Sequence, residues 1–203
     1  IQTSNGGTLW TLNANLNSTG VFCGDGLGGS DFIMVGANDV GCDVEFSDNA
    51  GTSFTVATEG SFTVFDPPKS LHISSTDLAY VTSGGYVMNW QRATSTNLSI
   101  LYSVGTLGTS SEVFEDIHAV TDQIVVAVGG DGSDDFVLRS VDGGSNWGLL
   151  SAGLPSVPVN GVHFYNETLG WVVGNDGTIS KSTDAGATWS AQVSGTALKL
   201  NSV

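Results

Sequence analysis

The sequence has few positively charged residues. Its 203 residues include 5 Lys and Arg against 20 Asp and Glu, so the formal net charge at pH 7 is −15. A chain of this charge repels the phosphates of nucleic acids and of anionic lipids at every approach. The composition therefore argues against nucleic acids and acidic membranes as partners.

Long apolar runs and proline are also scarce. No run approaches the roughly 20 apolar residues that a membrane helix requires, and the chain has 4 Pro but 28 Gly. Because 40% of the residues are hydrophobic, the composition indicates tight turns between short strands rather than disorder. The first residue is Ile1 and not Met, so we expect a processed product, an excised domain or a stretch of a larger protein.

The chain has only two cysteines, Cys23 and Cys42. A disulfide between them would close a short loop and stabilise the fold by about 3 kcal/mol in the chain-entropy model. The alternative is a pair of small buried thiols. No further Cys or His lies nearby at the spacing of a zinc site.

One eight-residue motif recurs along the chain. STDAGATW (182–189) and SVDGGSNW (140–147) share the pattern Ser/Thr, any residue, Asp/Asn, small, Gly, two of any type, aromatic. The same frame fits 3–10 and, with Phe for Trp, 47–54. The copies follow a period of about 45 residues, so we expect an eroded fifth copy at 92–98, where Asn97 replaces the Gly.

The segments between these boxes also repeat. Each carries three apolar strands before the box and one after it, most clearly in 160–189, with an Asn-Asp-Gly hairpin turn at 175–177. No segment shows helical periodicity. This arrangement is typical of a β-propeller blade. We predict an all-β propeller of four-stranded antiparallel blades over residues 1–203, with about 4.5 to 5 repeats.

The expected units are 1–17 (half a blade), 18–60, 66–104, 112–152, 157–194 and 195–203 (the start of a further blade). Residues 1–14 supply the end of a blade, and 197–203 supply the beginning of one. The two ends could complete one defective blade and close a five-bladed ring, or the chain could be a segment of a larger propeller. We favour the segment, because an open array leaves apolar sheet faces exposed.

The boxes resemble the Asp-box, or BNR, repeat of sialidases, sortilin-type receptors, xyloglucan-cleaving glycosidases and several non-enzymatic propellers. The unit 160–189 looks most like the repeats of the photosystem II assembly-factor family and its bacterial relatives. The resemblance covers essentially the whole chain. It implies the propeller fold and peripheral boxes, but not an activity, because the module recurs across unrelated functions.

We predict structural roles for the box residues. The Asp or Asn accepts hydrogen bonds from backbone N–H groups of the turn, the Gly permits a positive φ, and the aromatic side chain packs beneath the hairpin. The residues with these roles are Asn5, Gly7, Trp10, Asn49, Gly51, Phe54, Asp142, Gly144, Trp147, Asp184, Gly186 and Trp189.

Catalytic groups are hard to find. Sialidases bind their substrate with three arginines, whereas this chain has only Arg92 and Arg139, both placed just before a box, as is Lys181. A glycosidase needs two carboxylates about 5 to 9 Å apart. The candidates lie in the turns between second and third strands: Asp39, Asp43, Asp131, Asp134, Asp135 and Asp176. The alternative is that these are solvated acidic turns.

Two further patterns suggest metal ligands. Asp131, Asp134 and Asp135 gather in a Gly-rich turn that could bind Ca²⁺, with a solvated acidic loop as the alternative. No other cofactor is expected.

The three histidines, His72, His118 and His163, occupy one repeat position in the first strands, on the same face of each blade. They could form a metal-binding ring along the central channel. Phe22 stands at the equivalent position of the first full unit and breaks the ring, so repeated packing is the alternative.

The preferred functional hypothesis is a non-catalytic propeller, secreted or on a cell or virion surface, that binds protein or glycan partners or packs into a larger assembly. The alternative is part of a xyloglucanase-like glycoside hydrolase. A third hypothesis, an assembly factor similar to the photosystem II family, would need basic contact patches that 5 basic residues do not supply. The sequence thus leans towards a non-enzyme.

Overall fold

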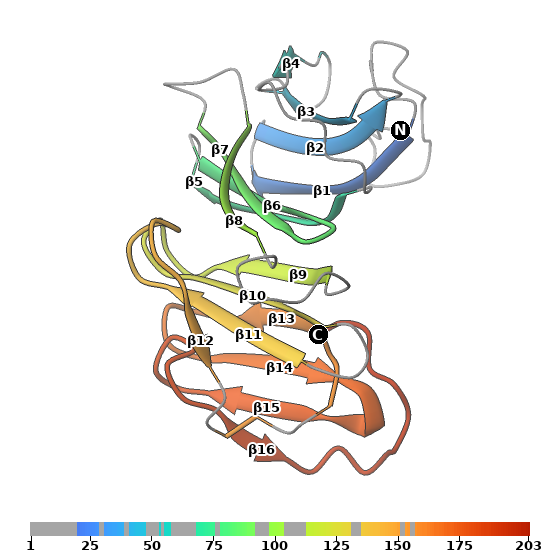
Figure 1. Ribbon diagram of the computed structural model, residues 1–203, viewed down its shortest axis with the longest axis vertical. Helices are drawn as coiled ribbons and strands as arrows, with labels where there is room; N and C mark the ends of the chain where they lie inside the picture. Colours follow the sequence, from blue (N-terminus) through green and yellow to red (C-terminus); the bar gives the residue numbers. More distant parts are fainter. Residues whose placement is uncertain are drawn as a thin grey trace.

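Four antiparallel sheets of four strands each follow one another in this computed structural model (Figure 1). The structure describes residues 20–28, 31–38, 41–47, 53, 55–57, 68–75, 78–91, 98–103, 113–130, 135–150, 153–154 and 157–203. In the first sheet the description covers the backbone, with the side chains of Asp25, Ser47 and Ser53.

The sheets are named blades 1 to 4 in chain order. Blade 1 contains β1 (Gly20–Gly28), β2 (Asp31–Asn38), β3 (Gly41–Ser47) and β4 (Thr55–Ala57). Blade 2 contains β5 (Pro68–Ser75), β6 (Leu78–Ser83), β7 (Tyr86–Gln91) and β8 (Leu98–Ser103). Blade 3 contains β9 (Val113–Ala119), β10 (Val125–Gly130), β11 (Asp135–Ser140) and β12 (Gly148–Leu150). Blade 4 contains β13 (Val159–Phe164), β14 (Gly170–Gly174), β15 (Ile179–Ser182) and β16 (Ser190–Gln192).

Within each blade, every strand pairs with its chain neighbour. The first strands of successive blades, β1, β5, β9 and β13, lie next to one another and form the inner edge of the array. The expected all-β propeller of four-stranded antiparallel blades is confirmed. The Asn-Asp-Gly turn also forms where the sequence predicts it, as a short 3-10 turn at Asn175–Gly177 in which Asp176 has a φ of 54°.

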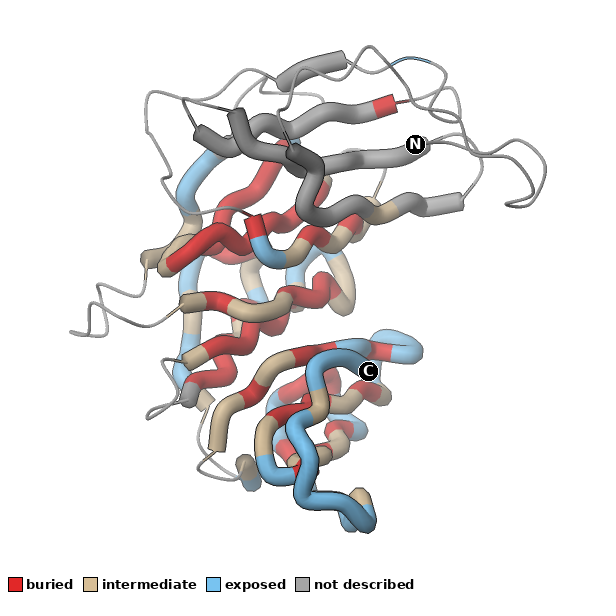
Figure 2. The backbone as a smooth tube through the Cα atoms, turned by 90° about the vertical axis from the view of Figure 1, so that its right-hand side faces the viewer, coloured by how far each residue is buried: buried red, intermediate tan, exposed pale blue. Residues whose placement is uncertain are grey.

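The core lies between blades rather than inside them. The β10 sequence VVAVGG is apolar at every position with a side chain, because both faces of this strand are covered, and Val125 to Val128 are all fully buried. Val125 and Ala127 join a cluster with Tyr80 and Val87 of blade 2. Figure 2 shows buried positions running along the strands of blades 2 and 3.

A second cluster joins blade 3 to blade 4. It brings Val126 and Val128 of β10 together with Val162, Phe164 and Val172 of blade 4.

None of the described residues forms a helix long and apolar enough to cross a membrane.

The two cysteines lie on strands that do not neighbour each other. Cys23 of β1 is opposite Val35, and Cys42 of β3 is opposite Ala37, so β2 runs between them. Strands on either side of a third are about 9.6 Å apart, whereas the Cα atoms of a disulfide lie about 4.4 to 6.8 Å apart. The backbone register therefore favours two thiols over the disulfide.

We predict two free thiols, because β2 separates the two cysteine strands. The chain denatured without reductant should react with two equivalents of a thiol reagent. Reaction only after reduction would show that the two residues pair and that this register is not the one adopted.

Candidate functional site

The box turns of blades 3 and 4 share one hydrogen-bond pattern. Asp142 Oδ1 accepts the backbone N–H of Asn146 at 2.8 Å, and Asp184 Oδ1 accepts that of Thr188 at 2.9 Å. The second carboxylate oxygen accepts from the Asn146 amide at 2.7 Å and from the Thr188 hydroxyl at 2.6 Å. Both carboxylates therefore hold the turn in shape.

These hydrogen bonds keep both carboxylates ionised. Hydrogen bonds from Thr188 lower the pKa of Asp184 to about 2, and those from Asn146 lower the pKa of Asp142. A general acid needs the opposite, a raised pKa, so neither group is suited to protonate a glycosidic oxygen.

The serine at the first position of the boxes in blades 3 and 4 has a role that the motif alone did not reveal. Ser182 is buried; its hydroxyl donates to Asp184 Oδ1 at 2.8 Å and accepts the backbone N–H of Gly186 at 2.9 Å. Ser140 repeats this in blade 3, donating to Asp142 and accepting from Gly144 at 2.8 Å. The Ser/Thr at the first motif position was the available signal.

The glycine and aromatic positions complete the turns. Gly144 and Gly186 have φ values of 90° and 78°, which favour glycine. Trp189 is buried in the cluster between blades 3 and 4, and the partly buried Trp147 packs against the cluster between blades 2 and 3. The remaining box residues lie outside the described part of the chain: Asn5, Gly7, Trp10, Asn49, Gly51, Phe54 and residues 92–97 of the expected fifth copy at 92–98.

The inner strands carry a second set of polar groups, which we call the inner seam: Asp25, Ser70, His72, Asp116, His118 and His163. Asp116 Oδ2 accepts the backbone N–H of Val162 in the next blade at 2.9 Å, and Oδ1 accepts the hydroxyl of Ser70 in the preceding blade at 2.5 Å. Asp25 accepts from the backbone of Ile73 at 2.9 Å. Each carboxylate therefore links its own blade to a neighbouring blade.

Burial raises the pKa of Asp116, although hydrogen bonds from Ser70, Val162 and Ile117 and the charge of His72 oppose the rise. A buried carboxyl with a raised pKa is the kind of group found in active sites. Here the hydrogen bonds account for both oxygens, so we assign Asp116 to blade docking. An Asp in a strand where the other repeats have Ser70 and Gly161 was the only sequence signal.

The three histidines form a stack. The ring centroids of His72 and His118 are 3.9 Å apart with a tilt of 41°, and those of His118 and His163 are 5.0 Å apart with an angle of 81°. His72 Nδ1 accepts the backbone N–H of Ala119 at 3.3 Å, so this nitrogen carries no proton. The shared repeat position therefore produces stacking contacts between blades.

Burial lowers the pKa of His118 to about 3, and repulsion from His72 and His163 acts in the same direction. Burial also lowers the pKa of His72, against the attraction of Asp25 and Asp116. Among the described residues, no three His, Cys, Asp or Glu side chains are placed to hold a metal ion. The stack is thus a packing contact between the inner strands, in which burial favours the neutral form of His72 and His118.

The other candidates divide between the described and undescribed parts of the chain. Asp39, Asp131 and Asp134 lie outside the described residues, as do the side chains of Asp43 and Asp135, the first residue of β11. Arg92 is also outside. Arg139 Nε donates to the backbone oxygen of Ala185 in blade 4 at 2.8 Å, so it connects two blades.

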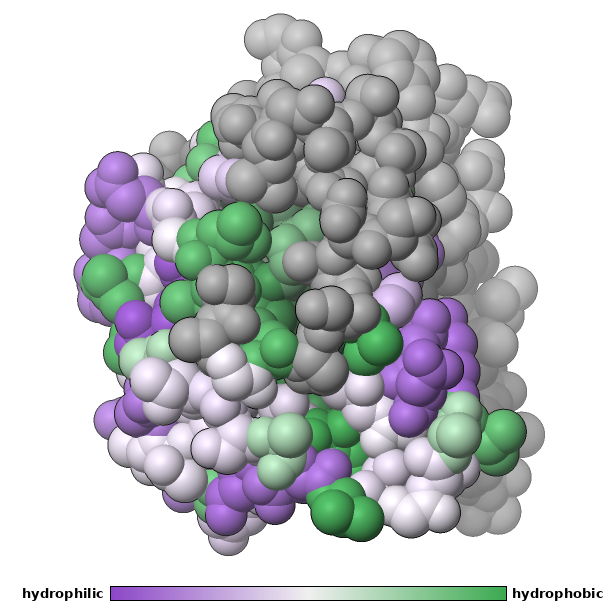
Figure 3. Space-filling view, turned by 60° about the horizontal axis from the view of Figure 1, so that its bottom comes forward, coloured by the Kyte–Doolittle hydropathy of each residue, from purple (hydrophilic) through white to green (hydrophobic). Residues whose placement is uncertain are grey.

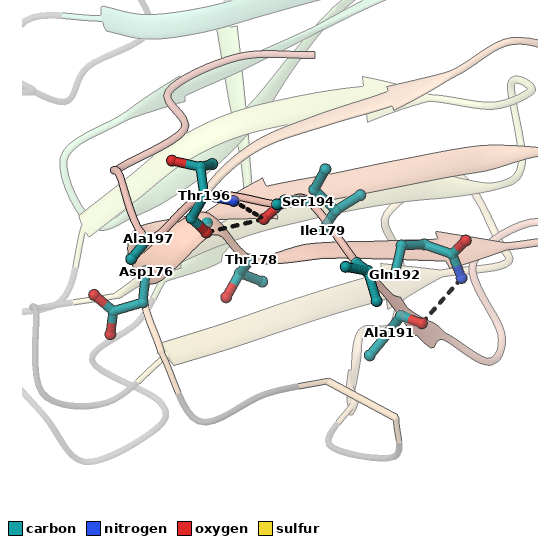
Figure 4. Close-up of a pocket in the computed structure, with 11 residues that line it drawn as sticks. Asp176, Thr178, Ile179, Ala191, Gln192, Ser194, Thr196 and Ala197 are labelled. Carbon is teal, nitrogen blue, oxygen red and sulfur yellow. Dashed lines mark hydrogen bonds between the residues drawn. The ribbon is translucent and has the colours of Figure 1, made fainter.

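A groove of about 520 Å³ lies at the edge of blade 4, between the β14–β15 turn and the segment that follows β16 (Figure 4). Asp176, Thr178, Gln192, Ser194 and Thr196 are among its lining residues. The Ser194 hydroxyl donates to the Thr196 carbonyl at 3.0 Å, and Asp176 is exposed. No described group in the groove is a candidate nucleophile with a matched base.

The repeat and the sheets define the chain as part of a β-propeller. No protein-family model and no curated protein sequence matches it. Two solved structures of YCF48 are similar. One, YCF48 bound to D1 peptide, has 19% identity and a TM-score of 0.65 over 94% of this chain and 59% of that one. The other, from Cyanidioschyzon merolae, has 12% identity and a TM-score of 0.65 over 94% of this chain and 65% of that one.

A GH74 xyloglucanase from Xanthomonas campestris is also similar, with 14% identity and a TM-score of 0.58 over 81% of this chain and 28% of that one. The chain thus spans less than two thirds of the length of each of these proteins. At such identities the likeness shows the fold alone. It confirms, at the level of fold, the propeller families that the repeat resembles.

We predict that Ser182→Ala destabilises the chain by about 1 to 3 kcal/mol, because the N–H of Gly186 would lose its acceptor at a buried site. Ser180 supplies a matched control on the same strand: it is also buried, but its hydroxyl has no hydrogen-bond partner among the described residues. Ser180→Ala should be neutral or slightly stabilising in urea unfolding. Equal losses in the two variants would contradict the assigned role.

We also predict acid lability from the histidine stack. His118 has a folded pKa of about 3 against about 6.5 unfolded, so the unfolded chain binds more protons between these values. The stability present above pH 6.5 is lost as the pH falls towards 3, by up to about 1.4 kcal/mol per pH unit for one histidine.

The measurement is urea unfolding from pH 7 to pH 5. The raised pKa of Asp116 acts in the opposite direction and reduces the slope wherever this carboxyl titrates. His118→Phe should flatten the pH dependence. The exposed His163 is the control, and His163→Phe should change it much less. A slope unchanged in His118→Phe would remove the stack as its cause.

Proposed function

We propose that the chain forms part of a non-catalytic β-propeller that binds protein segments through the turns at one end of its blades. The observation that carries the proposal is that three described carboxylates with altered pKa values, Asp116, Asp142 and Asp184, each accept backbone hydrogen bonds of the architecture. The ionisable groups thus serve blade and turn formation. The similar YCF48 structure, solved bound to a peptide, supports a protein ligand.

The net charge of the chain indicates which peptide segments it would bind. With a net charge of −15, the chain attracts cationic peptides and repels acidic ones. The strong acidity and scarce Lys also suit our proposal of a secreted or surface-exposed protein, with glycans as a second possible class of ligand.

The second candidate is a glycoside hydrolase of the xyloglucanase type, and the fold shared with the GH74 enzyme favours it. It requires two carboxylates across a cleft. Asp176 is the one turn candidate whose side chain is described; it is exposed and its oxygens have no described partner carboxylate in the groove. The binding function is therefore preferred.

The test uses an array of 15-residue peptides of cationic, neutral and acidic composition. We expect cationic peptides to bind, with affinity falling as salt rises from 50 to 300 mM. Asp176→Lys, in the β14–β15 turn, should weaken binding. Glu167→Lys, on the equally exposed β13–β14 turn at the other end of the blade, is matched in charge and should not.

The same preparations are incubated with xyloglucan. Hydrolysis of xyloglucan would be detected as newly released reducing ends. If this release is lost on an Asp→Asn change in a turn between the second and third strands of a blade, the hydrolase replaces the binding proposal. The binding proposal would also be contradicted if no peptide binds at low salt, or if Asp176→Lys and Glu167→Lys weaken peptide binding equally.

A further inference from the structure

One face of blade 4 is turned away from blade 3, and among the described residues no further blade covers it. We call it the open face: His163, Trp171, Val173, Ile179 and Lys181. The strand register places His163 opposite Trp171 and Trp171 opposite Lys181, while Val173 lies opposite Ile179. Alternate residues of these strands, including Val162 and Val172, face blade 3 instead.

The same positions are covered in the preceding blades. Val126 and Val137 of blade 3 correspond to Trp171 and Ile179, and both are buried in the cluster shared with blade 4. In blade 2 the corresponding residues are Tyr80 and Val87, buried against blade 3. Trp171 and Ile179 are only half-buried. Val173, on the same face, is buried. Blade 4 thus carries the apolar pattern of a covered face, but only part of this face is covered.

The polar positions repeat too. His72, the counterpart of His163, accepts a backbone N–H from the next blade. Arg139, the counterpart of Lys181, donates to the Ala185 carbonyl in the box turn of the next blade. In blade 4, Lys181 instead lies over the Trp171 ring at 6.0 Å. Both groups that form contacts between blades are available on the open face.

The last residues of the chain begin the next repeat on this face. The N–H of Leu200 donates to the carbonyl of Gly174 at 2.9 Å, just as Phe114 at the start of β9 donates to Gly84 of blade 2 at 2.8 Å. Ser202 lies against Gly161, where an added Cβ would come within 3.1 Å of the Ser202 Cα. Residues 200–203 therefore occupy the place of a following inner strand.

The groove at the edge of blade 4 lies where a following blade would pack. Ile179 and Gln192 line it and pair across β15 and β16. Their counterparts in blade 3, Val137 and Leu150, pair in the same way and pack against blade 4. Figure 3, which brings this end of the molecule forward, shows hydrophobic residues interrupting a largely polar surface.

We propose that the open face of blade 4 docks a further four-stranded blade of this repeat, whose inner strand begins at Leu200. The inference is independent of the proposed function. The occupant is a blade of the same type for a reason of pattern. The open face has the apolar Trp171 and Ile179, the His163 imidazole and the Lys181 ammonium at the positions through which blades 2 and 3 contact the next blade.

The test extends the chain after Val203 by a copy of residues 163–197, which continues the repeat in register because Val203 corresponds to Val162. We expect a monomer in which amides of β14 and β15 exchange with deuterium at least tenfold more slowly than in the unextended chain. Trp171→Glu in the original blade 4 should abolish this gain while changing little in the unextended chain. Val141→Glu, at an exposed apolar residue of the blade 3 box, is the control.

Unchanged exchange on extension, or equal effects of the two Glu variants, would overturn the proposal. So would a second copy as the occupant. In that case the unextended chain would associate, protection of β14 and β15 would rise with protein concentration, and Trp171→Glu would make it monomeric.

Discussion

A blade cannot bury either of its faces by itself, and the rest of the structure depends on this constraint. The central strands of blades 2 and 3 are buried on both sides, so these sheets need a neighbour on each. In β10, Val125 and Ala127 pack toward blade 2, while Val126 and Val128 pack toward blade 4. Each interface joins only two adjacent blades, so stability depends on nearest-neighbour contacts.

Polar groups follow from the same constraint. Where blades meet, buried N–H and C=O groups need partners. Asp116 satisfies Val162, Arg139 satisfies the Ala185 carbonyl, and Ser182 satisfies Gly186. Among the described residues, those with altered pKa values that accept backbone hydrogen bonds, Asp116, Asp142 and Asp184, join blades or hold turns.

The fold alone is compatible with different functions, since a peptide-bound YCF48 and a xyloglucanase both share it. What separates such proteins is the chemistry of their turns. The strongly acidic composition and the structural use of the inner carboxylates together favour a protein ligand, and the open face of blade 4 favours further blades rather than a small molecule.

Local pattern was enough to predict four-stranded blades, the Asn175–Gly177 turn and the box turns of blades 3 and 4, because alternation and turn chemistry act over a few residues. It also placed the three histidines at one repeat position. Whether they bind metal or stack depends on distances between blades about 45 residues apart, which only the tertiary structure decided. The roles of Asp116 and Ser182 and the separation of Cys23 from Cys42 were likewise decided there. Long-range register and burial, which set these contacts, are not encoded in any single repeat.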